Sequence, residues 1–194
     1  MTLPRPDRKT LRSELIAQRE TLSPVLRLQL QAEILPHLGE LLDRLAPRCV
    51  GFCWPYRGEP DLREYLSLWR AQGRDRSLGL PVLPEGEGPL RFRSWRPGVP
   101  TAPDRFGIPA PIDTGFVAPD LLIVPVNGFD PKGYRIGYGG GFFDRTLAAL
   151  DPAPRTIGVG FDLARVEDVF PLAHDRPLDW IVTESGIVVG PHNE

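Results

Sequence analysis

The pattern of apolar and polar residues along this chain predicts helices and strands that alternate with one another. Near the start, Leu11, Leu15 and Ile16 recur at helical spacing and give residues 8–20 one apolar face. Because residues three and four apart meet on one side of a helix, this stretch is predicted to be an amphipathic helix.

A second helix is expected directly afterwards. Ser23 is a typical N-cap, Pro24 is a typical first helical residue, and the apolar pattern continues to Leu45. Pro36 lies inside this stretch and predicts a break or a kink. The remaining patterns predict helices at 60–72 and 142–150, strands at 49–54, 77–83, 90–95, 121–126, 156–160, 179–183 and 186–189, and a proline-rich loop at 97–119.

Apolar strands that alternate with helices predict an α/β fold in which helices cover both faces of a sheet. The chain has 194 residues, which suits a single domain over 1–194. In parallel sheets of this kind, ligands bind beyond the carboxyl ends of the strands. Glu59, the glycines after residue 126 and Asp162 each follow a predicted strand. If these strands run parallel, the three lie on one rim of the sheet, at the carboxyl ends of its strands.

The sequence NGFDPKGYRIGYGGGFFD at residues 127–144 is the feature most indicative of function. Its glycines would let the backbone approach an anion, and the predicted helix that follows would attract negative charge. No Walker A motif occurs, and Phe142 replaces the third glycine of a dinucleotide fingerprint. The segment is therefore either a phosphate-binding loop of another kind or a glycine-rich turn without a ligand.

Basic residues near this segment are candidates for phosphate binding. Arg8 and Arg12 are four residues apart and share one face of the first helix, with Lys9 adjacent. They form either a clamp on a polyphosphate, if this helix crosses the glycine loop, or an ordinary solvated helix face. Arg135 stands two residues before the glycine run and either binds phosphate or forms a salt bridge with Asp130.

Acidic residues in the same regions are candidates for metal and ligand binding. Asp144 begins the helix after the glycines, where it either coordinates Mg²⁺ or complements the helix dipole. Asp175 is the second candidate metal ligand, with the capping of a turn as its alternative, whereas Asp179 opens a strand and is expected to be structural. Glu59 is either solvated or binds the N–H groups of a flat heterocycle beside aromatic side chains such as Trp54.

Other kinds of chemistry find no support in the sequence. The histidines lack metal-ligand spacing, and no nucleophile elbow or Cys/His pair occurs, so covalent hydrolysis is unsupported. The net charge of −2 gives no reason to expect nucleic-acid binding, and no apolar run is long enough for a membrane span. We expect a cytoplasmic protein, because residues 1–12 hold no secretion signal and Cys49 and Cys53 would lie roughly 13 Å apart in a regular strand, too far for a disulfide.

The residues around the glycines resemble the 5-formyltetrahydrofolate cyclo-ligase family, also called methenyltetrahydrofolate synthetases. The resemblance spans nearly the whole chain, and its pieces follow one another in the family's order. The strongest piece is Pro125-x-x-Gly128-Phe129-Asp130-x-x-Gly133-x-Arg135-Ile136-Gly137-x-Gly139-Gly140-Gly141-Phe142-Phe143-Asp144. The weaker pieces are Arg8-x-x-Leu11-Arg12, Glu59, Phe106-Gly107-Ile108-Pro109-x-Pro111, His174-Asp175-x-Pro177-x-Asp179 and Val182-Thr183-Glu184.

The resemblance implies a three-layer α/β/α fold with a mostly parallel sheet, similar to sugar-phosphate isomerases and CoA transferases. It also implies an activity in which ATP phosphorylates the formyl oxygen on N5 of 5-formyltetrahydrofolate. N10 then attacks the activated carbon, and loss of phosphate gives 5,10-methenyltetrahydrofolate. This route needs alignment and charge neutralisation rather than a covalent nucleophile. The expected enzyme is a monomer whose partners are these two small molecules.

The resemblance further assigns residues to each ligand. Arg12 and Arg135 are expected to neutralise charge during the transfer, and Asp144 and Asp175 to bind Mg²⁺. ATP is expected to contact Arg8, Lys9, Arg12, Arg135, Ile136, Gly137, Tyr138, Gly139, Gly140, Gly141, Phe142 and Phe143. The folate is expected to contact Trp54, Glu59, Tyr138, Gly139, Gly140, Gly141 and Phe142.

The chain departs from some members of the family at two places. They have a basic residue where this chain has Gly140, and two tyrosines where it has Phe142 and Phe143. Neither change removes a backbone donor. Two rival functions stay open at this point: a sugar-phosphate isomerase or acyl-CoA transferase, which would need a general base or a covalent carboxylate, and a non-catalytic nucleotide- or folate-binding module.

Overall fold

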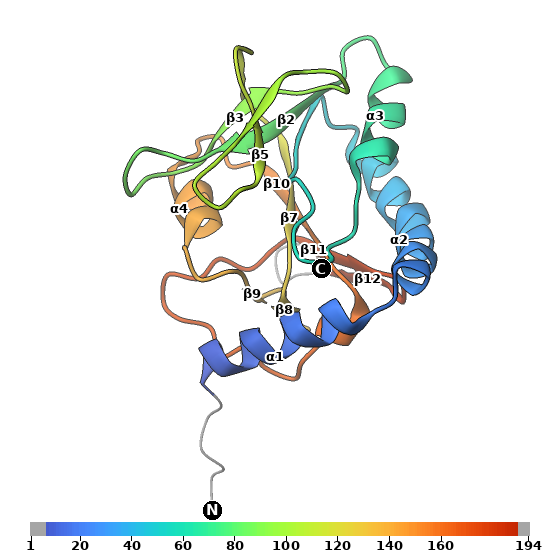
Figure 1. Ribbon diagram of the computed structural model, residues 1–194, viewed down its shortest axis with the longest axis vertical. Coiled ribbons are helices and arrows are strands. Elements are labelled where there is room, and N and C mark those ends of the chain that lie inside the picture. The colour runs from blue at the N-terminus through green and yellow to red at the C-terminus, as the bar shows by residue number, and fades with distance from the viewer. Residues whose placement is uncertain (1–6, 190–194) are drawn as a thin grey trace, which may run out of the picture.

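The computed structural model describes residues 7–189, which form four α-helices around a large sheet (Figure 1). The helices are α1 (Arg8–Thr21), α2 (Pro24–Leu45), α3 (Arg63–Ala71) and α4 (Phe142–Ala149), with one 3-10 turn, η1 (Asp162–Ala164). The strands are β1 (Cys49–Gly51), β2 (Ser77–Val82), β3 (Arg91–Ser94), β4 (Thr101–Pro103), β5 (Pro109–Pro111), β6 (Phe116–Val117), β7 (Leu121–Pro125), β8 (Gly128–Phe129), β9 (Arg135–Ile136), β10 (Arg155–Val159), β11 (Trp180–Thr183) and β12 (Gly186–Val189).

The main sheet has the strand order β12-β11-β10-β7-β1-β2-β3-β6. The five strands from β11 to β2 run parallel, whereas β12, β3 and β6 pair antiparallel at the two edges. The predicted, mostly parallel sheet is therefore confirmed. As a result, the loops that follow β1, β7 and β10 all leave from the same edge, which is the rim that the sequence predicted.

The central strand β7 shows why helices cover both faces. Leu121 and Ile123 pack into a core with residues of α2 and α3, whereas Leu122 and Val124 pack into a second core that the side chains of α4 partly cover. Successive side chains of a strand point to opposite faces, so a continuous apolar run needs cover on both. The predicted three-layer α/β/α fold is confirmed, and α1 lies across one end of the layers (Figure 1).

Helix α2 begins as predicted and continues further than Pro36 suggested. The Ser23 hydroxyl accepts a hydrogen bond from the Leu26 N–H at 3.2 Å, which is the expected N-cap. Of the two outcomes predicted at Pro36, the break is wrong, because the helix runs through it to Leu45, and the kink stays a prediction. Ile34 and Leu38 on either side are fully buried. Burying each stabilises the protein by roughly 1.5–3 kcal/mol, which together offsets the ~3 kcal/mol cost of an interior proline.

The proline-rich stretch at 97–119 is more ordered than the sequence predicted. It forms β6 at the sheet edge and the hairpin β4–β5, in which Pro103 pairs with Pro109. Proline is tolerated in such two-stranded edges because one side of each strand needs no ladder hydrogen bond. The hairpin tip places Phe106 edge-on to Phe142, with ring centroids 6.4 Å apart. The hairpin therefore reaches the first turn of α4.

The glycine-rich segment also begins with structure that periodicity did not reveal. Strands β8 and β9 pair as a short hairpin, and the Asp130 carboxylate closes its turn by accepting from the N–H groups of Lys132 and Tyr134 at 2.9 and 3.2 Å. Two-residue strands are too short for an alternation pattern to be visible in a sequence. The hairpin gives the loop that follows it a rigid base.

Two smaller predictions concern the cysteines and the membrane. Cys49 and Cys53 are both free thiols, which confirms that they do not form a disulfide. Strand β1 is shorter than predicted and ends before Cys53. Within residues 7–189, none of the helices combines the length and the apolar character that a membrane crossing requires.

Candidate active site

Helix α1 crosses the glycine loop, so its basic residues lie at the rim and not on a purely solvated face. The Arg12 guanidinium donates to the Gly137 carbonyl at 2.7 Å. Leu15 packs so closely on Gly128 that a Cβ there would lie 2.7 Å from its methyl group. The solvated-face interpretation is therefore wrong for Arg12, and it is wrong for Arg8, which forms the ion pair described below. Lys9 is exposed.

The glycine loop has a backbone that needs glycine at defined positions. Gly139 and Gly141 have φ values of 94° and 62°, in the left-handed region that other residues rarely adopt. At Gly140 a Cβ would lie 2.6 Å from the Phe142 ring. Tyr138, Gly139 and Gly140 are exposed, and α4 begins at Gly141 without a capping side chain. The loop therefore presents backbone and the uncapped start of a helix to solvent, as anion-binding loops do.

Two further arginines, which the sequence did not reveal as candidates, approach this loop. Arg145 reaches back from α4 and donates to the Gly140 carbonyl at 2.8 Å, with its guanidinium 5.1 Å from the centroid of the Phe142 ring. Arg105, in the β4–β5 hairpin, also approaches the Phe142 ring, with its guanidinium 5.5 Å from that centroid. The only sequence signal for Arg145 is its helical spacing of four residues from Gly141. Positive charge therefore surrounds the loop although the whole chain is slightly acidic.

Arg135 is buried beside Asp144. One of its terminal nitrogens donates to the Asp144 carboxylate at 2.9 Å, and the other donates to the Arg176 carbonyl at 2.8 Å. The alternative salt bridge to Asp130 is wrong, because the Asp130 carboxylate accepts from backbone N–H groups of its own turn and of Val169. The expected phosphate ligand and the expected metal ligand are thus in contact with each other.

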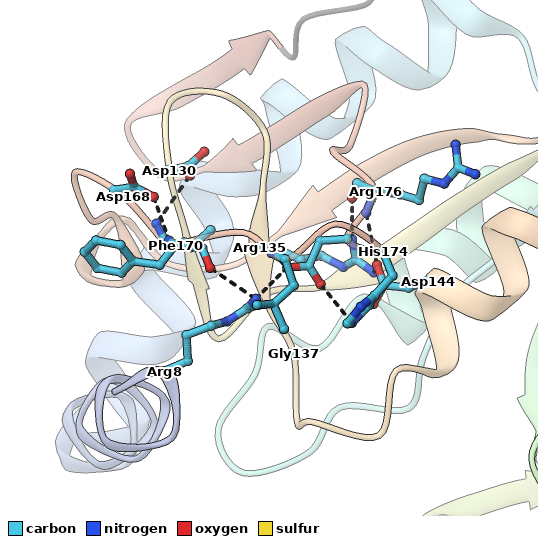
Figure 2. A network of polar contacts seen from close by, with 12 residues as sticks. Arg8, Asp130, Arg135, Gly137, Asp144, Asp168, Phe170, His174 and Arg176 are labelled. Atoms are coloured by element: carbon cyan, nitrogen blue, oxygen red, sulfur yellow. Dashed lines mark hydrogen bonds and ion pairs between the residues drawn. The ribbon is translucent and has the colours of Figure 1, made fainter. Parts of the chain in front are cut away.

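Asp175 joins the same network of polar contacts through its ion pair with Arg8, and Figure 2 shows Arg8, Arg135 and Asp144 in that network. One of its carboxylate oxygens accepts from Arg8 at 2.5 Å and from the Leu172 N–H at 2.7 Å, so it also caps a turn, as the alternative interpretation held. The N–H of the next residue, Arg176, donates to Asp144 at 3.3 Å. The two predicted metal ligands therefore come from facing segments that touch.

This pair of carboxylates fits a magnesium ion better than a transition metal. The described residues contain no group of three or more His, Cys, Asp or Glu side chains that could enclose a metal. Mg²⁺ does not need such a cage, since it commonly takes one or two carboxylates and fills its remaining positions with water and phosphate oxygens. The hard oxygen donors of Asp144 and Asp175, next to a phosphate-type loop, are of that kind.

On the other side of the loop, Glu59 forms a buried cluster. Its side chain is only 5% exposed, so the solvated interpretation is wrong. One carboxylate oxygen accepts from the Tyr138 hydroxyl at 2.7 Å and the other from the Tyr56 N–H at 3.0 Å. Burial raises the pKa of Glu59, while the Tyr138 hydrogen bond and the charge of Arg19 oppose that rise. Tyr138 belongs to the glycine loop, so it joins Glu59 to the proposed phosphate site.

Arg19 and Asn127 complete this cluster and were missed in the sequence. Arg19 is 3% exposed and donates to the Tyr138 hydroxyl at 2.9 Å and to the Asn127 side-chain oxygen at 2.8 Å. It lies seven residues after Arg12, on the same face of α1, and this heptad spacing is the signal that could have revealed it. Asn127 directly precedes β8 and is almost completely buried.

Four predicted site residues lie apart from this arrangement. Trp54 packs edge-on to Trp95 and lines a separate hollow of about 420 Å³ between α3 and the loop after β3. Asp162 follows β10 and lies on the predicted rim, but its ion pair is with Arg165 and not with the glycine loop. Two side chains of the ATP set point inward: Ile136 is fully buried, and Phe143 packs partly against the core beneath α4.

Comparisons with known proteins agree with this geometry. The model of the 5-formyltetrahydrofolate cyclo-ligase family matches residues 4–184. The chain belongs to this family. It is 29% identical over 191 residues to the 5-formyltetrahydrofolate cyclo-ligase of Haemophilus influenzae, covering 94% of this chain and 97% of that one. It is 36% identical over 140 residues to the enzyme of the same name from Escherichia coli, covering 68% and 75%.

Solved structures of cyclo-ligase relatives share the fold. The 5,10-methenyltetrahydrofolate synthetase of Aquifex aeolicus superposes with a TM-score of 0.80 at 27% identity, over 96% of this chain and 94% of that one. A 5,10-methenyltetrahydrofolate synthetase from Mycoplasma pneumoniae gives a TM-score of 0.75 over 92% and 99%, and at 18% identity this likeness concerns the fold alone. The family assignment from the glycine motif is therefore confirmed.

Proposed function

We propose that this chain converts 5-formyltetrahydrofolate to 5,10-methenyltetrahydrofolate with hydrolysis of ATP to ADP and phosphate. The observation that carries the proposal is the position of the glycine loop. On one side the loop adjoins arginines and the Asp144–Asp175 carboxylates, and on the other Tyr138 joins it to Glu59. A nucleotide and a folate held on these two sides would meet at the loop, as direct phosphoryl transfer requires.

The chemical steps balance without any group of the protein becoming bonded to the substrate. The formyl oxygen on N5 takes the terminal phosphoryl group of ATP, and ADP leaves. N10 attacks the activated formyl carbon and loses its proton, and the C–O bond to phosphate breaks. The chain's part is to align the two reactants and to neutralise the charge on the moving phosphoryl group.

The ATP side of the site is assigned to the loop amides and to arginines. Arg12 lies over Gly137, Arg135 lies beneath the loop, and Arg145 lies on Gly140. Arg145 gives this chain a cation beside Gly140, where some relatives have a basic side chain of the loop itself. Arg8 contacts Asp175 and the Phe170 carbonyl, and it is assigned to the terminal phosphates beside the proposed metal ligands. Lys9 would act through long-range attraction.

Mg²⁺ is assigned to Asp144 and Asp175. When bound, the ion would supply a positive charge that offsets the negative charge of the phosphates. Each carboxylate now pairs with an arginine, Arg135 or Arg8. A magnesium nucleotide would offer phosphates to the arginines and an ion to the carboxylates, so both halves of each pair would have a partner in an exchange.

The folate side is assigned to Glu59 and Tyr138, with Trp54 further away. An ionised Glu59 accepts hydrogen bonds only, which suits the N–H-rich edge of the substrate's heterocycle. The exposed face of Tyr138 and the edge of Phe142 offer apolar contact. The hollow beside Trp54 is lined by Arg63 and is assigned to the outer, anionic end of the folate. We further propose that residues 1–194 form one domain and act as a cytoplasmic monomer.

An absorbance assay tests the proposed function. Purified protein is mixed with 5-formyltetrahydrofolate and magnesium ATP, and formation of the methenyl chromophore is followed with ATP present and absent. Turnover that needs ATP is expected. Turnover without ATP would favour the isomerase or transferase alternative, and calorimetric folate binding without any product would favour a non-catalytic binding module.

A further inference from the structure

Arg19 ties together three loops at the carboxyl end of the sheet. Its Nε donates to the Arg57 carbonyl at 3.0 Å, in the loop after β1, and one terminal nitrogen donates to the Asn127 side-chain oxygen at 2.8 Å, after β7. The other terminal nitrogen donates to the Tyr138 hydroxyl at 2.9 Å, in the glycine loop. Arg19 thus joins the loop that carries Glu59 to the glycine loop that carries Tyr138.

The contact with Arg19 fixes the direction of the Tyr138 hydroxyl. A guanidinium can only donate, so the Tyr138 oxygen must accept from Arg19. The hydroxyl has a single hydrogen, which is then committed to the Glu59 carboxylate at 2.7 Å. Without Arg19 the same hydroxyl could rotate and accept from another donor. The arginine therefore determines which way this bridge between the two ligand sides points.

Arg19 also compensates the charge of Glu59. Its terminal nitrogen lies 3.9 Å from the nearer Glu59 oxygen, and both side chains are about 5% exposed or less. In addition to Arg19, the groups that face this carboxylate are the Tyr138 hydroxyl, the Tyr56 N–H and the Cys53 thiol, whose own pKa is raised by burial and by Glu59. Arg19 is the only cation among them, so its charge joins the Tyr138 hydrogen bond in opposing the effect of burial, which raises the pKa of Glu59.

Asn127, which accepts a hydrogen bond from Arg19, has an unpaired buried atom that indicates a functional constraint. Asn127 gives its side-chain oxygen to Arg19, and its side-chain nitrogen is buried without a hydrogen-bond partner. Buried donors are almost always paired in folded proteins, so an unpaired one needs an explanation. A site that places Arg19 at one defined point, at some cost in stability, provides that explanation.

We propose that Arg19 is a positioning residue of this enzyme, which orients the Tyr138 hydroxyl and places a positive charge beside Glu59, the acceptor for the folate. The proposal rests on the proposed function, because it assumes that Glu59 binds the substrate. It adds that a buried residue of α1, the helix whose other arginines serve the ATP side, controls the folate side. Arg19 acts through its neighbours and is not assigned any contact with the reacting atoms.

Kinetics of two Arg19 variants, with Arg76→Met as the control, form the first test. Arg76 is a half-buried arginine that donates to the Trp69 carbonyl at 2.8 Å and stacks on the Trp69 ring, far from the glycine loop. Arg19→Met should raise KM for 5-formyltetrahydrofolate at least about tenfold, the effect of losing a charged hydrogen bond, while KM for ATP changes less than about twofold. Arg76→Met should change neither.

Arg19→Lys keeps the test decisive if the methionine variant does not fold. Lysine preserves the charge but cannot serve the Arg57 carbonyl, Asn127 and Tyr138 with one planar group. This variant should be folded and show a smaller rise in the folate KM, again with the ATP KM unchanged. A folded Arg19→Lys protein with wild-type folate KM, or with equal losses for both substrates, would overturn the proposal.

A measurement without substrate separates this proposal from the proposed function. Carboxyl ¹³C NMR follows the Glu59 signal, assigned through Glu59→Gln, as pH is varied. The pKa of Glu59 should be higher in Arg19→Met than in the wild type and closer to the wild type in Arg19→Lys. An unchanged Glu59 titration in both variants would overturn the positioning role. Failure of the wild type to make methenyltetrahydrofolate would overturn the proposed function and with it the folate as the ligand of Glu59, but it would not alter the measured coupling between Arg19 and Glu59.

Discussion

The two sides of the glycine loop are built in different ways. On the ATP side, Arg135–Asp144 and Arg8–Asp175 are ion pairs in which one partner of each is about one-fifth exposed. On the folate side, Arg19 and Glu59 are both buried and held by several hydrogen bonds. Ion pairs within reach of solvent can exchange partners, whereas a buried network of hydrogen bonds is costly to rearrange.

This difference indicates how each ligand is recognised. A magnesium nucleotide brings both a cation and anions, so it can take over both halves of an arginine–carboxylate pair without leaving either one unpaired. A folate brings neutral N–H groups, so it needs an acceptor whose charge and direction are already set. The two sides therefore correspond to partner exchange and to preorganisation, and each can be removed separately by substitution.

Arg135→Ala should have the largest effect. It removes a buried cation from beneath the loop, and kcat/KM for ATP should fall by roughly 10²–10³-fold, as for loss of a donor to transition-state charge. The folate KM should change little. Steady-state kinetics with each substrate varied measures both. Arg165→Ala, which breaks an exposed ion pair with Asp162 near the same rim, is the control, and unchanged ATP kinetics in Arg135→Ala would contradict the assignment.

Glu59→Gln should produce the complementary loss. The neutral amide cannot accept at both oxygens, so kcat/KM for the folate should fall by about 10–100-fold while the ATP KM is preserved. The wild type should also lose kcat/KM for the folate as pH falls, because protonation removes the acceptor. Burial raises the pKa of Glu59, so this loss should begin at higher pH than for an ordinary carboxyl. If Glu59→Gln and the wild type showed the same dependence of the folate kcat/KM on pH, Glu59 would not be the group whose protonation removes the acceptor.

Asp144→Asn sharpens the interpretation of the ATP side. If this carboxylate binds Mg²⁺, activity should fall about tenfold more at limiting than at saturating Mg²⁺, since the variant binds the ion more weakly. Activity titrated against Mg²⁺ gives the result. An equal loss at both concentrations would instead assign Asp144 to the helix dipole and to Arg135.

Tyr138→Phe should have the smallest effect and tests the link between the two sides. It removes one neutral hydroxyl, which donates to Glu59 and accepts from Arg19, while keeping the ring that packs on Tyr56. The folate KM should rise about two- to tenfold with the ATP KM nearly unchanged. Tyr134→Phe, in the turn of the β8–β9 hairpin, is a control in the same segment. A larger change in the KM for ATP than in the KM for the folate would contradict the assignment of Tyr138 to the folate side.

The sequence predicted the parallel sheet and the main helices well, because long apolar runs and the cap at Ser23 are local signals. It predicted neither the β8–β9 hairpin nor the β4–β5 hairpin, whose strands are too short for a visible alternation. The break at Pro36 was wrong because tertiary burial of Ile34 and Leu38 outweighs a local preference.

The sequence predicted which residues belong to the candidate site more accurately than it predicted which of them contact each other. The glycines, Arg12, Arg135 and Asp144 do lie together, but the pairing of Arg135 with Asp144 depends on how α4 and the 170s loop pack. Arg19 escaped notice because an arginine on an amphipathic helix is usually solvated, and only the fold shows that it is buried. Trp54 lies elsewhere because its loop turns towards α3.

Calorimetric binding of a non-hydrolysable ATP analogue with Mg²⁺ tests the two-sided site most directly. The wild type, Arg135→Ala and Glu59→Gln are titrated under the same conditions. The account predicts that Arg135→Ala loses most of the analogue's affinity, while Glu59→Gln binds it like the wild type. Equal weakening in both variants, or loss confined to Glu59→Gln, would contradict the division of the glycine loop into an ATP side and a folate side.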